Sequence, residues 1–160
     1  GNHGMWTKCV MYEESAGIPL ILSGPGVSKG EVNSTQASLV DIHPTILQAT
    51  GLGLSSNDLD LPGYSLLDLV AGESPDRLVL SEYHDGGSIT GMFMIRKNQY
   101  KYVYYPGYQP QLYDLEKDPD EFDNLWHQPD ASGRKMRLLK ACFDSSVFTM
   151  DPMPPRLGAF

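Results

Sequence analysis

Four short stretches, closely spaced between residues 78 and 115, constrain the fold more than any other part of this sequence. They are residues 78–83, 92–96, 100–105 and 111–115. Their aliphatic and aromatic side chains are typical of strands, where tyrosines ordinarily serve packing. Asn98 and Gln99 can turn the chain between the second and third stretches, because Asn tolerates a positive φ. The last three stretches leave no room for a crossover helix, so we expect them to pair as antiparallel strands.

The first 26 residues join a polar, glycine-rich start to a short apolar run. Residues 1–8 read Gly-Asn-His-Gly-Met-Trp-Thr-Lys, and residues 18–22 read Ile-Pro-Leu-Ile-Leu before Gly-Pro-Gly. A continuous apolar run of this kind indicates a short buried strand of a parallel sheet. Glycines let a loop bring its backbone close to a ligand. Lys8 offers a compact positive charge suited to an anionic group.

Two helices are predicted between this run and the four strands. Residues 38–51 place Ile42 and Ile46 on one face at helical spacing, and Asp41 is the expected N-cap. Ser65 is expected to cap a short second helix. This region therefore predicts a helical segment that precedes the antiparallel strands.

Two further helices are predicted after the strands. Asp118, Pro119 and Glu121 indicate a helix start, with the aspartate as cap and the glutamate returning a hydrogen bond to it. Residues 132–143 are predicted to form the last helix. The proline-rich tail from residue 151 is expected to be irregular, and it can lie across the domain or reach a second subunit of a homo-oligomer.

The charge balance opposes two classes of partner. The chain of 160 residues has a formal net charge of −8 and a pI near 4.8. An acidic surface does not attract nucleic acid or an anionic membrane, so neither is an expected partner. No apolar run approaches the roughly 20 residues of a membrane-spanning helix. Cys9 and Cys142 form no Cys-x-x-Cys pair and are interpreted as separate thiols.

The start of the chain resembles the type I sulfatases of the alkaline phosphatase superfamily, such as choline sulfatase and the arylsulfatases. The family typically reads Gly-Asp/Glu-His-Gly-x-Trp-x-Lys and then Glu-x-Ser-x-x-Val-Pro-Leu-Ile, which residues 1–8 and 14–21 follow. Asn2 stands where an acid is usual, and Gly17 where Arg is common. Residues 115–125, Leu-x-x-Asp-Pro-x-Glu-x-x-Asn-Leu, resemble the family's C-terminal signature.

The resemblance implies an α/β fold. Residues 1–72 would be the C-terminal end of an alkaline-phosphatase-like α/β/α sheet domain. Residues 73–150 would form a small α+β C-terminal subdomain, in which helices pack on a four-stranded antiparallel sheet, and residues 151–160 an irregular tail. The resemblance covers nearly the whole chain but only the C-terminal part of the family's length. The missing N-terminal part of the same protein is therefore an expected partner.

The resemblance also implies a chemistry, the hydrolysis of sulfate esters. The family uses a formylglycine made from the Cys or Ser of a Cys/Ser-x-Pro-x-Arg motif, together with a calcium ion held by carboxylates. Neither Cys9 nor Cys142 begins such a motif, and the family's metal-binding motifs do not occur in this sequence. The formylglycine and the calcium ligands would then lie upstream of this chain, which by itself is expected to be inactive.

Four residues of this chain are the implied contributors to the site. Lys8 would contact the sulfate or its bridging oxygen, and His3 would assist it in the same pocket as a catalytic residue. His84 follows a predicted strand and precedes a glycine loop, in a region that lines the substrate entrance of relatives resembling choline sulfatase. Together with Trp6, it is the expected substrate contact.

Two alternatives remain open from the sequence. A phosphonate or phosphate ester hydrolase of the same superfamily is not distinguished, because the nucleophile and metal ligands are missing. A non-enzymatic acidic module could instead bind a partner through the tyrosine-rich strand at residues 100–105. The sequence is equally compatible with a bacterial cytoplasmic or periplasmic protein and with a secreted one.

Overall fold

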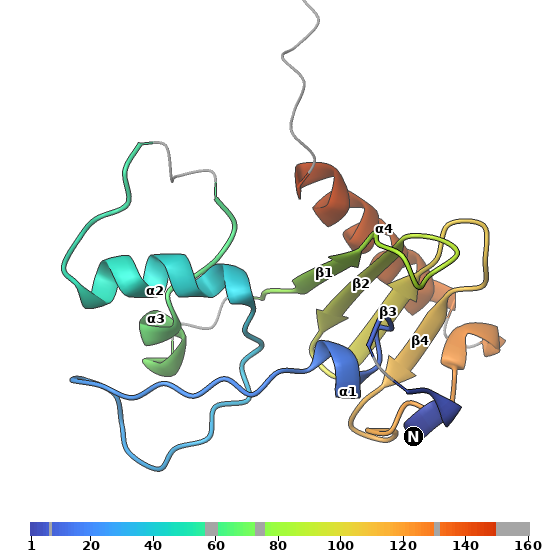
Figure 1. Ribbon diagram of the computed structural model, residues 1–160, viewed down its shortest axis with the longest axis horizontal. Helices are drawn as coiled ribbons and strands as arrows, with labels where there is room; N and C mark the ends of the chain where they lie inside the picture. Colours follow the sequence, from blue (N-terminus) through green and yellow to red (C-terminus); the bar gives the residue numbers. More distant parts are fainter. Residues whose placement is uncertain (7, 57–60, 73–75, 130–131, 150–160) are drawn as a thin grey trace, which may run out of the picture. The chain divides into compact units, whose positions relative to one another are not determined.

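The computed structural model describes residues 1–6, 8–56, 61–72, 76–129 and 132–149 (Figure 1). The chain divides into two compact units. The sheet unit comprises residues 1–17 and 80–160, and the helical unit comprises residues 18–79. The start of the chain thus belongs to the same unit as the strands, a grouping that the sequence did not indicate. The domain boundary predicted at residues 72 and 73 stays a prediction.

The sheet unit is built on four strands that lie side by side in chain order. They are β1 (Val79–Tyr83), β2 (Met92–Lys97), β3 (Tyr100–Tyr104) and β4 (Gln111–Asp114). β2 pairs antiparallel with β3, and β3 pairs antiparallel with β4. Asn98 has a φ of 52° in the β2–β3 turn, the left-handed conformation that tight hairpin turns require. The prediction of a four-stranded antiparallel sheet is confirmed.

Helices lie on both faces of this sheet (Figure 1). α4, Ser132–Thr149, packs against β2 and β3 and extends beyond its predicted end at residue 143. The opposite face carries the start of the chain, with the short helices η1, Asn2–Gly4, and α1, Glu13–Ala16. Among the described residues, no helix is both long enough and apolar enough to cross a membrane.

Side chains alternate between the two faces along each strand, as the pleat requires. On the α1 side, Met11 packs with Met92, Met94 and Val103 in an apolar cluster. On the other side, the fully buried ring of Tyr102 lies 5.7 Å from that of Trp126, which follows β4. Residues on the α1 side of β2 and β3 therefore face the start of the chain.

The helical unit contains η2 (Leu39–Asp41), α2 (Ile42–Ala49) and α3 (Leu66–Val70). The prediction that Ser65 caps the second helix is confirmed, because its hydroxyl accepts a hydrogen bond from the amide of Leu67 at 3.2 Å. Asp41 is the N-cap residue of α2, as predicted, but its side chain makes no capping hydrogen bond to that helix. Ser38 is the N-cap of η2 and forms a capping box with Asp41, whose carboxylate accepts from the Ser38 amide at 2.7 Å.

Asp41 is fully buried, and its carboxylate joins several segments of the helical unit. Both of its carboxylate oxygens accept hydrogen bonds from Arg77, at 3.0 and 2.9 Å, and the amide of Tyr64 donates to it at 2.9 Å. Asp41 therefore binds a charged partner 36 residues away in addition to the Ser38 amide of the local capping box. The apolar face predicted for α2 exists, but Ile42 and Ile46 are exposed, while Thr45 is buried.

The strand predicted at residues 18–22 is wrong for this chain. The segment has no regular structure, and Ile21 is 89% exposed. A strand needs a neighbour that takes up its backbone hydrogen bonds, and the sheet of the described residues contains only β1 to β4. The apolar run is therefore an exposed apolar segment. A strand that could pair with it is not among the described residues.

Residues 118–121 form a turn, so the helix start predicted there is also wrong. Asp118 accepts hydrogen bonds from the amides of Phe122 at 3.1 Å and Asp123 at 2.7 Å. Glu121 has a φ of 57°, which is incompatible with a continuing helix. Its side chain is buried against Lys101 rather than returned to the cap. The tail predicted from residue 151 lies outside the described residues.

Candidate functional site

The start of the chain presents one cation and one large aromatic side chain to solvent. Lys8 is exposed, and Trp6 is 83% exposed. Thr7, between them, lies outside the described residues. Cys9, which follows Lys8, has a φ of 75°, so the chain turns sharply after the lysine. Lys8 therefore stands on a surface loop where its ammonium group is accessible.

His3 is less exposed than Trp6 and Lys8. Its ring stacks on Tyr12, with ring centroids 3.8 Å apart and planes within 5°, and a second ring, that of Phe122, lies 4.8 Å away. The Nε2 atom is buried and has no hydrogen-bond partner among the described residues. His3 is thus held by ring packing rather than by hydrogen bonds from its side chain.

Asn2 is held in place by a hydrogen bond to Glu14 of α1. Its side-chain amide donates a hydrogen bond to a carboxylate oxygen of Glu14, and this bond lowers the pKa of Glu14. Asn2 thereby ties the start of the chain to α1.

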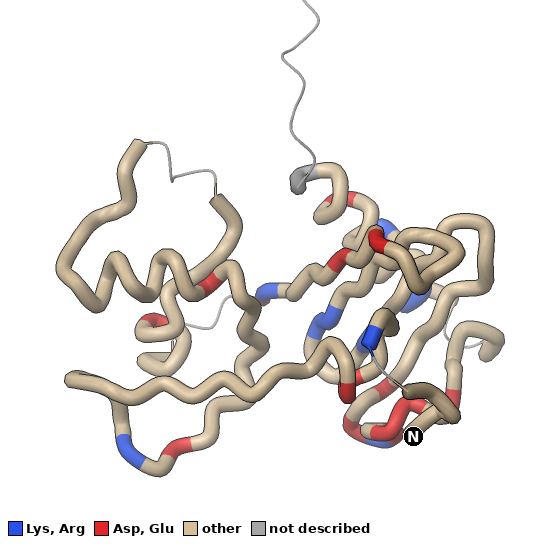
Figure 2. Tube along the Cα trace, in the orientation of Figure 1, with Lys and Arg blue, Asp and Glu red and all other residues tan. Residues whose placement is uncertain are grey.

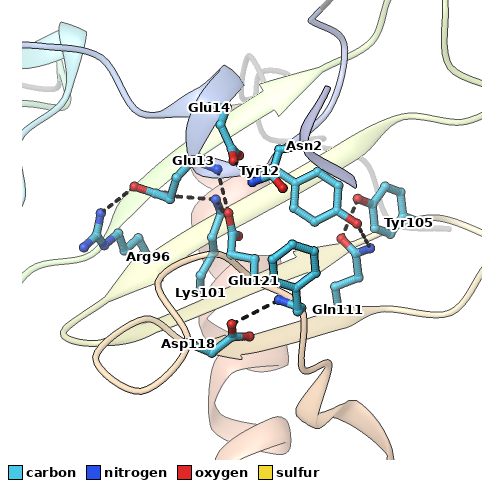
Figure 3. Close-up of polar contacts among 11 residues, drawn as sticks. Asn2, Tyr12, Glu13, Glu14, Arg96, Lys101, Tyr105, Gln111, Asp118 and Glu121 are labelled. Carbon is cyan, nitrogen blue, oxygen red and sulfur yellow. Dashed lines mark hydrogen bonds and ion pairs between the residues drawn. The ribbon is translucent and has the colours of Figure 1, made fainter. Parts of the chain in front are cut away.

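A group of four charged side chains lies between α1 and the sheet (Figure 3). The Nζ atom of Lys101 is 2.9 Å from Glu13 and 2.9 Å from Glu121, and Arg96 Nη1 is 3.1 Å from the other oxygen of Glu13. We call these four residues the charged cluster. Figure 2 shows the same pattern along the chain, with basic positions on the strands close to acidic positions in the neighbouring segments.

Sequence reasoning missed the charged cluster, although one signal was present. The turn at Asn98 and Gln99 fixes the hairpin register, and that register sets Arg96 directly opposite Lys101. Two cations on one face of a hairpin repel each other unless an acid lies between them. The sequence could therefore have shown that an acid was required, but not that it would be Glu13.

The loop after β1 approaches the segment that carries Lys8. The hydroxyl of Tyr83 lies 3.0 Å from the sulfur of Cys9 and 2.7 Å from the carbonyl oxygen of Gly86. The hydrogen bond to Cys9 raises the pKa of Tyr83 to about 12, so the hydroxyl stays protonated near neutral pH. The neighbour of Lys8 is thus tied to the strand end that precedes His84.

His84 is exposed on this loop. Its ring lies edge-on to Phe93, with ring centroids 4.9 Å apart, and its Nε2 atom is 3.7 Å from a carboxylate oxygen of Glu82. The structure brings the segments of His84 and Lys8 together through Tyr83 and Cys9. His3 lies instead against Tyr12, beside the charged cluster.

The described residues contain no cluster of side chains that could bind a metal ion. Among those residues, no three His, Cys, Asp or Glu side chains gather where an ion could be held. The described residues therefore do not fit the calcium ion that the resemblance implies.

Comparison with known proteins places the chain in a family. Residues 1–145 match the model described as N-sulphoglucosamine sulphohydrolase, C-terminal. Arylsulfatase K of Mus musculus is 38% identical over 136 residues, which are 78% of this chain and 24% of that protein. The human arylsulfatase K matches equally, at 38% identity. The chain therefore spans about a quarter of the length of these relatives.

Solved structures agree in fold. BT4656, in complex with its substrate D-glucosamine-2-N,6-O-disulfate, superposes with a TM-score of 0.81 over 98% of this chain and 33% of its own, at 23% identity. BT1596, a 2-O GAG sulfatase, does so with a TM-score of 0.62 and 28% identity over 78% of this chain and 28% of its own. The predicted alkaline-phosphatase-like α/β class with a C-terminal antiparallel-sheet subdomain is thereby confirmed. The chain belongs to the N-sulphoglucosamine sulphohydrolase C-terminal family, and it corresponds to the C-terminal part of a type I sulfatase.

Proposed function

We propose that the full-length protein hydrolyses sulfate esters and that Lys8 contacts the sulfate or its leaving oxygen. The observation that carries this proposal is the exposed Lys8 at the end of the motif Gly-x-His-Gly-x-Trp-x-Lys, in a chain 38% identical to arylsulfatase K. The loop that carries the lysine is tied to the sheet unit through Asn2, His3 and Cys9. A loop held in this way limits the reorganisation needed to bring its cation to the reacting group.

Lys8 would act on the charge that develops during bond cleavage. The bridging oxygen of a sulfate ester becomes more negative as the S–O bond breaks. An ammonium group close to that oxygen interacts more strongly with the transition state than with the bound substrate. The calcium ion and the formylglycine of a type I sulfatase supply charge neutralisation and the nucleophile, and we place both outside this chain. His3 would orient the segment through the stacking of its ring on Tyr12.

The substrate class proposed here is a sulfated sugar. The matching family is described as N-sulphoglucosamine sulphohydrolase, and the 28% identical BT1596 is a 2-O GAG sulfatase. The exposed ring of Trp6 offers a flat apolar surface on which a sugar ring can pack, and His84 offers a polar contact on the neighbouring loop. Both residues are therefore proposed as substrate contacts.

Steady-state kinetics of the full-length protein test the proposal. Lys8→Ala should lower kcat by on the order of 10²-fold, comparable to deleting one preformed oxyanion donor. The loss should be larger for an aryl sulfate with a poorer leaving group, because more charge then remains on the oxygen. Lys29→Ala, at an exposed lysine of the helical unit, is the matched control and should change nothing.

Three outcomes would change this reading. An equal loss with good and poor leaving groups would move Lys8 from the leaving oxygen to the sulfate group. No loss at all would remove Lys8 from the site. If an aryl phosphate or phosphonate is turned over faster than the matching sulfate, the proposed activity changes from a sulfatase to a phosphonate or phosphate ester hydrolase.

A further inference from the structure

Two cations face each other across the β2–β3 hairpin, and Glu13 bridges them. Arg96 and Lys101 are register partners, so their side chains leave the same face of the sheet. Glu13 accepts from Lys101 with one carboxylate oxygen, at 2.9 Å, and from Arg96 with the other, at 3.1 Å (Figure 3). Like charges directly opposite on paired strands destabilise a sheet. The bridging carboxylate converts this repulsion into two charge-assisted hydrogen bonds.

Glu121 completes the charged cluster from a different segment. It lies 2.9 Å from Lys101 Nζ, and its other carboxylate oxygen accepts from the backbone amide of Glu13 at 2.6 Å. Lys101 and Glu121 are 0% and 1% exposed, so water competes little for these contacts. Two cations and two carboxylates balance in charge. Residue 13 is thus fixed twice, by its backbone to Glu121 and by its side chain to two strands.

The neighbours of Glu13 transmit this fixed position to the start of the chain. Tyr12, one residue before it, stacks on His3, and its hydroxyl accepts from Gln111 of β4 at 3.1 Å. Glu14, one residue after it, accepts from Asn2. Residues 12 to 14 therefore connect the loop that carries Lys8 to β2, β3 and β4.

We propose that Glu13 is a positioning residue for Lys8, which it holds at the site by anchoring the segment of residues 12–14 to the charged cluster. This inference rests on the proposed function, because it assigns Glu13 a role in the same reaction. Displacing a catalytic group by about 1 Å can cost on the order of 10²-fold in rate. Since Lys8 acts mainly in the transition state, its displacement should lower kcat and leave KM nearly unchanged.

The test is a double-mutant cycle in the full-length protein. Glu13→Ala should lower kcat on an aryl sulfate at least tenfold with little change in KM, and Glu116→Ala, at an exposed glutamate of the sheet unit, should not. In a Lys8→Ala background, Glu13→Ala should cost nothing further, because a missing ammonium group cannot be misplaced. Glu13→Gln keeps one acceptor oxygen and should recover much of the rate.

The cycle separates this inference from the proposed function. If Lys8→Ala lowers kcat while Glu13→Ala does not, or if the two losses multiply, Glu13 does not position Lys8 and only the inference fails. If Lys8→Ala leaves kcat unchanged, both proposals fail. Glu13→Ala should fold, since Lys101 keeps Glu121 as its partner. Should it not fold, Arg96→Met removes one contact of the half-exposed Arg96 and must show the same dependence on Lys8.

Discussion

Replacing Lys101 by methionine should destabilise the sheet unit, because it leaves a buried carboxylate without a cation. Lys101 is fully buried, and it is the cation paired with Glu121, which is 1% exposed. Breaking a buried ion pair by removing one partner costs about 3–5 kcal/mol. Glu121 would keep the backbone hydrogen bond from Glu13 at 2.6 Å, and Glu13 itself is partly exposed and can be rehydrated. We therefore expect the lower end, about 3 kcal/mol.

The physical reason for this cost predicts a rescue. Glu121→Gln removes the buried negative charge but keeps an oxygen that can accept from the Glu13 amide. In combination with Lys101→Met it should therefore restore part of the lost stability, whereas either change alone should destabilise. Lys140→Met is the control, because this lysine is 73% exposed and its partner Asp144 is 47% exposed. A surface pair of this kind contributes about 0–1 kcal/mol.

Native-state hydrogen exchange in the full-length protein measures these costs locally. If β3 opens as part of the sheet unit, a loss of about 3 kcal/mol should speed exchange of its amides by on the order of 10²-fold. The double variant should exchange more slowly than Lys101→Met alone. A change below tenfold in Lys101→Met, or a further loss on adding Glu121→Gln, would refute the idea that an uncompensated charge is the cause.

Three further predictions concern other parts of the chain. Gly63→Ala should cost on the order of 1–3 kcal/mol, because φ is +124° there and an added Cβ would lie 2.5 Å from the Val40 carbonyl oxygen. Gly53→Ala, where nothing lies within 4 Å, is the control, and urea midpoints compare the two variants. Burial raises the pKa of the Cys142 thiol from 9.0 to about 11. The protonated thiol is thus favoured by folding, so its contribution to stability is full below pH 9 and is lost as pH rises through 11. Urea midpoints at pH 8 and 10.5 should therefore differ less in Cys142→Ala than in the parent. The isolated 160-residue chain should self-associate and bind a hydrophobic dye, because it exposes 89% of Ile21 and 99% of Val32, and a monomer in light scattering at all concentrations would contradict this.

The hairpins of the sheet were predictable because their signals are local. Asn98 can adopt the positive φ of the turn, and the strands on either side alternate in side-chain character. The cap at Ser65 is local in the same sense, since the hydroxyl bonds an amide two residues away. The strand predicted at residues 18–22 was wrong because a strand depends on a contact that is not local in sequence. The apolar side chains indicate that the segment tends to be buried. Whether it forms a strand depends on a neighbouring strand, which the local sequence does not reveal.

The sequence predicted the residue types of the candidate site, but not the contacts that hold its loop in place. The motif at residues 1–8 singles out Lys8 by type and spacing, and the structure finds it exposed. Nothing in that motif indicates that its loop is held by Tyr12, Glu13 and Glu14, because those contacts depend on where β2, β3 and β4 lie.

Two acids predicted at helix starts each have a distant partner that the local pattern does not contain. Asp41 and Glu121 both stand where an acid can serve a helix start, a role that requires only neighbours in sequence. In the structure each pairs with a buried cation far along the chain, Arg77 or Lys101. A cap contributes about 1 kcal/mol, whereas a buried cation left without its carboxylate costs several. For Glu121 the buried cation therefore decides the role of the acid, whereas Asp41 serves both, because its carboxylate accepts from Arg77 and from the Ser38 amide of the local capping box.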